Sequence, residues 1–507
     1  MIRNKIVLLC LLICFHALAG AQTPAPVKRL LQAPYMRGAS FSLIVKDVQD
    51  GKTVCSYDTD RLQSPASVLK TVATATALEI LGEDYRYPTT LEYDGTLENG
   101  TLKGNLYIKG SGDPSLGSSY FAPDQNKFLS AWIAALQKAG IRRITGSIIS
   151  DESIFDTEGA SVKWLREDMG NYYAPGSYGL SIFDNMYKLS LQTGAVGSRP
   201  VLKGTEPNIP FIRFKNYLKT ASVSSDSAYI IGAPLDDVRY LYGVLPANRE
   251  AYVLKGDIPD PALYLAHYLT DRLRQKGIQV DGAPSCYRIE AEENRWNKKE
   301  RKEIVTTYSP TLREIASVCN HVSHNLYADA LVKTIGLQYK PRKNEVISSF
   351  GRGVQVVKEY WEKKGLDVFS LRMNDGSGLA PADKVSAGFM GELLAYMATE
   401  SAVSEAFIAS LPQAGIEGSV RNFLKGSKLQ GKARLKSGGI TGVRSYAGYI
   451  TEDGKTYAVA IFSNNYSCPM NRMTGALEKL LLQLFNCQLK LGYAVSSYKC
   501  PLSIEIE

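Results

Sequence analysis

Apolar residues follow two different periods along this chain, and the changes of period divide it into segments. Residues 40–60, SFSLIVKDVQDGKTVCSYDTD, place strand-like apolar runs on either side of the turn QDGK. The next stretch, SPASVLKTVATATALEIL, is apolar over more than three turns and predicts a buried helix. Ser64 is expected to cap this helix, with Pro65 at its first position.

From residue 84 the pattern changes to short strands separated by glycine turns, as in YPTTLEYDGTLENGTLKGNLYIKGSGDPSL. A helix is expected near 125–140, followed by a strand in ITGSIISDESIF. Residues 186–251 again have β character, and residues 260–277 have strong helical periodicity. The charged stretch EAEENRWNKKERKE, 290–303, is typical of a solvated linker.

Beyond residue 305 the pattern is helical in SPTLREIASVCNHV and NLYADALVKTIGLQY. The strands KARLKSGG and RSYAGYITEDGKTYAVAIFSNN follow, with EDGK as a hairpin turn, and the last predicted helix covers 472–486. No repeat and no low-complexity tract occurs. The pattern therefore predicts one α/β (α+β) domain whose two halves enclose an inserted, β-rich middle.

The length of 507 residues exceeds one ordinary core and predicts two or three domains. The start combines a basic MIRNK, the apolar run IVLLCLLICF and small residues at Ala19 and Ala21, which is the pattern of a signal peptide cut after Ala21. The apolar run is short for a membrane anchor, so we expect a soluble exported protein. Removing Arg3 and Lys5 lowers the formal net charge from +9 to +7, because residues 1–21 hold no acidic residue.

Six cysteines remain after such a cleavage, and export permits disulfides among them. Their wide spacing, without a Cys-x-x-Cys, argues against a zinc cluster. The pair we would test first is Cys487 with Cys500.

Candidate chemistry starts in the predicted helix, where Ser67 lies one turn before Lys70 on the same face. The first-turn N–H of Ser67 has no partner inside the helix and is free to bind an anion. A neutral lysine can take the hydroxyl proton, provided that burial or a nearby cation lowers its pKa. Ser-x-x-Lys also occurs by chance, and the chain has a second copy at Ser496 to Lys499.

Two further stretches change the weight of this motif. HVSHNLYA places Ser323 and Asn325 in the junction between two predicted helices. RLKSGGITG places Lys436, Ser437 and Gly438 on a strand, with small residues that let a substrate lie close. Helix capping and an exposed strand lysine would explain each stretch alone. The order Ser-x-x-Lys, Ser-x-Asn, Lys-Ser-Gly is instead the signature of β-lactamases and penicillin-binding proteins.

With these motifs the chain resembles the penicillin-binding protein 4 type of serine D-alanyl-D-alanine carboxypeptidase and endopeptidase. GSGDPSL (110–116), GSIISDESIF (146–155), DGSGLA (375–380) and SLPQAGIEGSV (410–420) are similar too. The resemblance implies a β-lactamase/transpeptidase-like domain with an antiparallel sheet at 22–83 and 305–507. It also implies an inserted domain II at 84–185 and 252–304, and a domain III at 186–251.

The resemblance also implies roles for the motif residues. Ser67 would attack the carbonyl of the penultimate D-alanine, with Lys70 as its base. Ser323 and Asn325 would relay protons to the leaving amine and hold the substrate amide. Lys436 would lie near the substrate carboxylate and help to keep Lys70 neutral.

Ser437 and Gly438 would assist in substrate binding, and the backbone N–H groups of Ser67 and Gly439 would form the oxyanion hole. The substrate implied is a peptidoglycan stem peptide ending in D-Ala-D-Ala, with β-lactam antibiotics as inhibitors. Neither a metal nor an organic cofactor is implied, nor nucleic acid, nor a transmembrane segment in the mature chain. The location implied is the bacterial periplasm.

Two departures from the family pattern affect these expectations. The third motif has Ser437 in place of the commoner threonine, which keeps the hydroxyl, but Gly439 stands where a threonine is frequent. The balance between carboxypeptidase and endopeptidase action is therefore open. A β-lactamase and a non-catalytic penicillin-binding wall sensor remain as alternatives, whereas an esterase is disfavoured because Ser67 lacks a Gly-x-Ser-x-Gly setting.

Overall fold

Both ends of the described chain contribute to one antiparallel sheet. The structure is a computed structural model that describes residues 23–297 and 299–488. The sheet has the strand order β2-β1-β24-β23-β22, and each neighbouring pair is antiparallel. Its strands are β1 (Ser40–Asp47), β2 (Thr53–Tyr57), β22 (Ala433–Ile440), β23 (Val443–Glu452) and β24 (Lys455–Asn464). The predicted signal peptide, the second motif copy at Ser496 and the side chains of Cys487 and Cys500 lie outside the described part.

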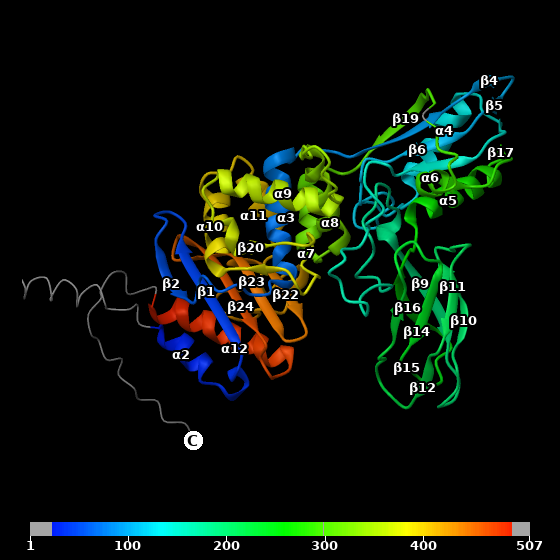
Figure 1. Cartoon of the computed structure of the whole chain (residues 1–507). Helices are drawn as coiled ribbons and strands as arrows, with labels where there is room; N and C mark the ends of the chain where they lie inside the picture. Colours follow the sequence, from blue (N-terminus) through cyan, green and yellow to red (C-terminus); the bar gives the residue numbers. More distant parts are fainter. Residues whose placement is uncertain (1–22, 298, 489–507) are drawn as a thin grey trace, which may run out of the picture.

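Helices cover both faces of this sheet (Figure 1). On one face, α2 (Ala25–Leu31) and α12 (Met470–Gln483) share an apolar core with the sheet. On the other face, α10 (Ala387–Thr399) packs against β1 and β24, and the remaining helices share one apolar core with it and the sheet. The predicted antiparallel sheet with helices, built from the two ends of the chain, is confirmed.

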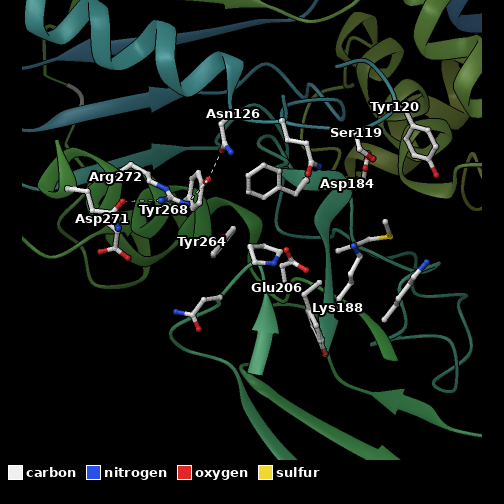
Figure 2. A pocket seen from close by; sticks show the side chains of 18 residues that line it. Ser119, Tyr120, Asn126, Asp184, Lys188, Glu206, Tyr264, Tyr268, Asp271 and Arg272 are labelled. Carbon is white, nitrogen blue, oxygen red and sulfur yellow. Dashed lines mark hydrogen bonds between the residues drawn. The ribbon is translucent and has the colours of Figure 1, made fainter. Parts of the chain in front are cut away.

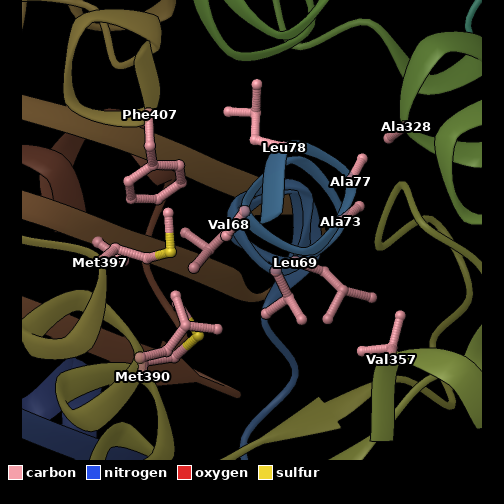
Figure 3. Packing of buried hydrophobic residues seen from close by; sticks show 14 of the residues in the cluster. Val68, Leu69, Ala73, Ala77, Leu78, Ala328, Val357, Met390, Met397 and Phe407 are labelled. Carbon is pink, nitrogen blue, oxygen red and sulfur yellow. The ribbon is translucent and has the colours of Figure 1, made fainter. Parts of the chain in front are cut away.

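The centre of the helical layer is α3 (Leu69–Leu81), in which every residue from Leu69 to Leu78 is buried. A helix that is apolar on all sides is stable only inside a core. Figure 3 shows this surround, with Phe407, Met390 and Met397 on one side of the helix and Ala328 and Val357 on the other. The helices around it are α7 (Leu312–His321), α8 (Asn325–Ile335), α9 (Ser349–Lys363) and α11 (Ser404–Ser410).

The start of α3 differs from the sequence prediction. Ser64 does not cap the helix; its backbone N–H donates to Asn464 Oδ1 at 2.7 Å. A 3₁₀ turn, Ala66–Val68, comes before the α-helix. Ala66 has a φ of 46°, which lies outside the right-handed helical region, so a regular helix cannot run on from Pro65. Ser67 therefore lies in a tight turn at the foot of α3.

The inserted region leaves the helical layer on β3 (Pro88–Tyr93) and returns on β19 (Lys302–Tyr308), which pair as antiparallel neighbours. These strands belong to a sheet with the order β18-β8-β6-β3-β19, beside a second sheet, β17-β7-β5-β4. Two helices accompany them, α4 (Lys127–Lys138) and α5 (Pro261–Gln275), as expected. The remaining elements are β4 (Thr96–Glu98), β5 (Thr101–Lys103), β6 (Leu106–Lys109), β7 (Arg143–Ile144), β8 (Ile148–Asp151), β17 (Gln279–Val280) and β18 (Ser285–Cys286).

The predicted β character of 186–251 is confirmed in three small sheets, β10-β9-β16, β11-β14-β13 and β12-β15 (Figure 1). Their strands are β9 (Met186–Gln192), β10 (Val201–Glu206), β11 (Arg213–Asn216), β12 (Lys219–Ala221), β13 (Tyr229–Ile231), β14 (Val238–Tyr242), β15 (Val244–Pro246) and β16 (Tyr252–Asp257). The division of the insertion at 84, 186, 252 and 304 stays a prediction.

The charged stretch 290–303 is more than a solvated linker. Its first residues complete α6 (Tyr287–Glu292). Arg301 stacks on the ring of Tyr107, 3.8 Å from the centroid, and pairs with Asp151 at 2.7 Å. The high charge of this stretch therefore gave no indication that one of its arginines stacks on an aromatic ring in the folded protein.

Two helical glycines give a matched test of this packing. A Cβ on Gly353 of α9 would lie 2.1 Å from the carbonyl oxygen of Val332 on α8, whereas one on Gly475 of α12 would meet nothing within 4 Å. We expect Gly353→Ala to lower the free energy of unfolding by about 2 kcal/mol, since the helices must separate. Gly475→Ala should raise it by about 0.5–1 kcal/mol through helix propensity. Urea unfolding measures both, and equal effects would contradict the close approach.

Candidate active site

The structure brings Ser67 and Lys70 together at the foot of α3. Lys70 Nζ lies 2.9 Å from Ser67 Oγ and donates a second hydrogen bond to the carbonyl oxygen of Ser377 at 2.6 Å. The Lys70 side chain is fully buried, whereas Ser67 is partly exposed. Burial lowers the pKa of Lys70 below its ordinary value, although the nearby carboxyl groups partly oppose this effect. The arrangement favours an uncharged amine next to an accessible hydroxyl.

A second lysine–serine pair lies beside the first. Lys436 Nζ, from β22, donates to Ser323 Oγ at 2.9 Å and to the carbonyl oxygen of Ser437 at 2.6 Å. Ser323 lies between α7 and α8 with a φ of 62°, as the predicted junction requires. Burial lowers the pKa of Lys436 well below its ordinary value, and the charge of Lys70 lowers it further. That repulsion is mutual, so each ammonium disfavours the other.

Asn325 and Ser437 lie next to the two lysine–serine pairs, but each side chain already makes a hydrogen bond within the protein. The Asn325 Nδ2 group donates to the carbonyl oxygen of Tyr173 at 2.6 Å. The Ser437 hydroxyl donates to Ser419 Oγ at 2.9 Å. A ligand that uses either side chain must therefore replace a hydrogen bond or share it.

Gly438 permits the edge strand to lie directly against the turn that carries Ser67. A Cβ at this position would be 2.3 Å from Ser445 Oγ and 2.5 Å from the carbonyl oxygen of Pro65. Ser445 Oγ in turn donates to that carbonyl at 2.6 Å. The small residue that the sequence pointed to thus fixes the distance between β22 and Ser67.

The serines of the two pairs line one cleft of about 970 Å³, whereas both lysines are buried behind it. Ser67, Ser323, Asn325 and Gly439 line it from the part built by the two chain ends. The inserted region supplies the opposite wall, with Leu165, Arg166, Glu167, Asp168, Tyr173, Tyr229 and Ile231. No sequence pattern predicted that the inserted region would lie at the cleft.

A loop at 375–380 supports the first pair, and its carboxylate was missed by sequence reasoning. Asp375 accepts hydrogen bonds from the N–H groups of Gly378 (2.6 Å) and Ala380 (2.9 Å) and from Trp164 Nε1 (2.7 Å). Trp164 comes from the inserted region and packs on Leu379 and Ala380. The stretch DGSGLA was noticed as a similarity, but nothing in it indicated an indole partner.

Asp329 of α8 fixes the carbonyl that Lys70 uses. Its Oδ1 accepts from the N–H groups of Gly376 (2.8 Å) and Ser377 (3.0 Å). Burial raises the pKa of Asp329 well above its usual range. The only sequence signal was a lone acid in an apolar helix, which is rare unless the acid is hydrogen-bonded.

The described cysteines Cys55, Cys286, Cys319 and Cys468 are unpaired thiols. Within residues 23–297 and 299–488, no group of three or more His, Cys, Asp or Glu side chains is arranged to hold a metal ion. In the same part of the chain, no helix has the length and apolarity needed to cross a membrane.

Comparison with known proteins agrees with this geometry. The sequence profile of the D-Ala-D-Ala carboxypeptidase 3 (S13) family matches residues 24–479. The D-alanyl-D-alanine carboxypeptidase of Actinomadura sp. (strain R39) is 26% identical over 457 residues, which cover 87% of this chain and 81% of that protein. The carboxypeptidase DacB of Haemophilus influenzae is 24% identical over 446 residues, 87% of each chain.

Solved structures show the same fold. Penicillin-binding protein 4 (dacB) of H. influenzae superposes with a TM-score of 0.77 at 22% identity, covering 91% of this chain and 98% of that one. The structure of that protein in complex with a novel β-lactam gives a TM-score of 0.72 at 21% identity, with coverage of 91% and 100%.

Gly378 provides a sharp test of the supporting loop. Its φ is 76°, and an added Cβ would lie 1.9 Å from the carbonyl oxygen of Ala66, next to Ser67. Gly454 has the same φ of 76° in a hairpin turn, with nothing within 4 Å. Both alanine variants carry backbone strain of about 1 kcal/mol, but only Gly378→Ala should displace Ser67.

We therefore expect Gly378→Ala to slow labelling by a fluorescent penicillin at least about tenfold, whereas Gly454→Ala labels like the parent. Thermal melting measures the loss of stability that backbone strain causes in both variants. Equal labelling rates in the two variants would show that the loop does not position Ser67.

Proposed function

Because the chain belongs to the D-Ala-D-Ala carboxypeptidase 3 (S13) family, we propose that it hydrolyses the D-Ala-D-Ala bond of peptidoglycan stem peptides through an acyl-enzyme on Ser67. The observation that carries the proposal is the pair of buried lysines, Lys70 on Ser67 and Lys436 on Ser323, whose serine partners line one cleft. A serine beside a neutral amine is an activated nucleophile.

In the acylation step, Ser67 Oγ bonds to the carbonyl carbon of the penultimate D-alanine, and the hydroxyl proton moves to Lys70 Nζ. The carbonyl oxygen becomes an oxyanion. The N–H groups of Ser67 and Gly439, both residues of the cleft wall, are the proposed donors to it. Such preorganised donors contribute about 2.7–4 kcal/mol each in comparable sites.

The C–N bond then breaks, and the leaving amine needs a proton. Ser323 supplies it from its hydroxyl and receives in its place the proton that Lys70 took from Ser67, passed on through Lys436, which lies 2.9 Å from Ser323. Lys70 is thereby neutral again before water enters. The terminal D-alanine departs. Water attacks the ester carbon, Lys70 takes the water proton, and the Ser67 oxygen leaves and recovers its own.

Substrate binding is proposed for Asn325, Ser437 and Gly438. The Asn325 amide would exchange its bond to the Tyr173 carbonyl for one to the peptide, and Ser437 and Lys436 would bind the substrate carboxylate. Gly438 lets the peptide lie along β22. Gly439 offers no side-chain hydroxyl to a terminal carboxylate, so an endopeptidase reaction, in which that carboxylate is absent, is part of the proposal.

β-Lactams would acylate the same serine, because their strained amide resembles the cleaved bond. The structure of H. influenzae penicillin-binding protein 4 with a β-lactam supports this. The proposed location is the bacterial periplasm, after removal of residues 1–21.

Removal of the Ser67 hydroxyl tests the nucleophile. Ser67→Ala should abolish acylation by penicillin while the protein stays folded, since a small, partly exposed hydroxyl is lost without a cavity in the core. Ser496→Ala, which removes the other Ser-x-x-Lys serine, is the matched control and should label fully. Intact-protein mass spectrometry measures the adduct; an adduct on Ser67→Ala would disprove the assignment.

The same time course separates the alternatives. An adduct that persists while the enzyme releases D-alanine from a pentapeptide supports the peptidase. An adduct that disappears as free drug is hydrolysed indicates a β-lactamase. A stable adduct without release from a pentapeptide or a cross-linked dimer indicates a sensor.

The rate of acylation should depend on pH. Because burial lowers the pKa of Lys70, its neutral form is present at lower pH than for an ordinary lysine. The acylation rate constant should therefore rise with pH and reach its plateau below about pH 10.4, and it should fall as acid protonates the amine.

Lys70→Arg keeps a cation at every accessible pH and should slow acylation by about 10²–10⁴-fold. Lys363→Arg, an exposed residue of α9, is the control for the substitution itself. A plateau that begins only near the pKa of a free lysine would contradict a buried neutral base. Stopped-flow acylation with a chromogenic β-lactam gives the profile.

A further inference from the structure

A second cavity, of about 700 Å³, lies inside the inserted region, outside the site described above. Figure 2 shows its walls. Helix α5 contributes Tyr264, Tyr268 and Arg272, the start of β9 contributes Lys188, and Glu206 lies at the rim. The cavity is thus built where the two parts of the insertion meet.

The charges around this cavity balance. Its basic side chains are Lys188, Lys255 and Arg272, and its acidic ones are Asp184, Glu206 and Asp271. A site for a phosphate or another polyanion is expected to carry an excess of positive charge, which is absent from these walls. Donors and acceptors are present in similar numbers. Hydroxyl and amide groups of a ligand, which both donate and accept, suit such a wall.

Aromatic rings also line the cavity. The Tyr268 ring is half-buried, with Phe183 at its edge (5.3 Å between centroids) and the Arg272 guanidinium 4.9 Å from its centroid. Its hydroxyl donates to Asn126 Oδ1 at 2.5 Å, which fixes the ring. A fixed ring offers flat apolar area at little entropic cost. The C–H face of a pyranose ring has the matching shape and polarity.

Two tyrosines of the cavity lining are almost completely buried. Tyr187 and Tyr264 are each 1% exposed and line the cavity, and neither hydroxyl has a hydrogen-bond partner among the described residues. A buried hydroxyl without a partner costs free energy, and natural proteins retain few of them. Both hydroxyl oxygens are themselves buried, so they stiffen the wall behind the cavity and do not face its open space.

The cavity shares a wall with the catalytic cleft. Tyr120, at its rim, packs edge-on against the ring of His324, which lies between Ser323 and Asn325. Asp184 accepts a hydrogen bond from the Tyr327 hydroxyl of α8 at 2.8 Å. The residues that hold the second catalytic motif are therefore in contact with the cavity lining.

A second contact connects the two spaces on the other side. Lys255 Nζ, in the cavity wall, lies 5.5 Å from the ring centroid of Tyr172. Tyr172 packs on Tyr173, whose side chain lines the catalytic cleft. One short segment thus separates the space proposed for the stem peptide from the second cavity.

We propose that this cavity binds the N-acetylated amino sugars of the glycan chain that carries the stem peptide. The proposal rests on the proposed function for the identity of the polymer. The amino sugar would lie on the Tyr268 ring, with its hydroxyl and amide groups toward the balanced polar wall. The enzyme thereby recognises the sugar as well as the peptide, and prefers peptide that is attached to the wall polymer.

The experiment compares kcat/KM for a free pentapeptide with that for the same peptide on its N-acetylglucosaminyl-N-acetylmuramic acid disaccharide. The parent enzyme should prefer the disaccharide peptide. In Tyr268→Ala that preference should fall by about two- to tenfold, the range that one aromatic contact supports. The matched control is Tyr308→Ala on β19, whose tyrosine is 66% exposed and lies outside the cavity lining; it should keep the parental ratio.

Ligand-observed NMR with the disaccharide alone tests the cavity without any turnover. Saturation transfer to the parent, lost in Tyr268→Ala and kept in Tyr308→Ala, supports the proposal even if no peptide is hydrolysed, an outcome that would refute the proposed function only. Penicillin labelling checks that each variant is folded, and Arg272→Gln replaces Tyr268→Ala if that variant is not. Equal kcat/KM for the two peptides together with no transfer to the parent would overturn the sugar site.

Discussion

The whole site depends on keeping one amine out of water. A charged lysine is strongly disfavoured in a dry interior, and this penalty lowers the pKa of Lys70 below that of an ordinary lysine. Dryness has to be maintained on every side at once. The apolar shell of α3 closes one side, the edge strand β22 another, and the 375–380 loop the third, with Trp164 of the insertion packed on that loop. Elements from distant parts of the sequence therefore act together to keep the pKa of Lys70 low.

Local patterns in the sequence predicted the parts of the site that local geometry determines. Ser67 and Lys70 share a face because three residues make nearly one helical turn, and Ser323 lies in a junction because polar residues interrupt two apolar periods. The mispredicted helix start at Ser64 and the unforeseen Asp375 have a common cause. Asn464 takes the N–H of Ser64 from 400 residues away, and Trp164 reaches Asp375 from 211 residues away. Such contacts depend on the finished fold and leave no periodic trace.

Helix α8 holds the inserted region in place against the cleft. Asn325 holds the Tyr173 carbonyl, Tyr327 holds Asp184, and Lys333 donates to the carbonyl oxygens of Glu158 and Ser177. Burial lowers the pKa of Lys333 to about 8, so this anchor is itself costly. Rigid elements position functional groups better than loops do, and one helix here carries both Asn325, for which a role in substrate binding is proposed, and the anchor of the opposite wall. A shift of the insertion would be felt directly at Asn325.

The site is also a concentration of unfavourable local features. Ala66 and Ser323 have positive φ values of 46° and 62°, and burial raises the pKa of both Asp329 and Asp383 well above the usual range. Such unfavourable backbone angles and buried carboxyl groups persist only where the surrounding structure holds them in place. Here the surroundings are the continuous apolar core around α3, which lies directly beneath Ser67. The buried helix α3 thus lies beside a strained turn, and each cost at the cleft is offset by packing within reach of the same residues.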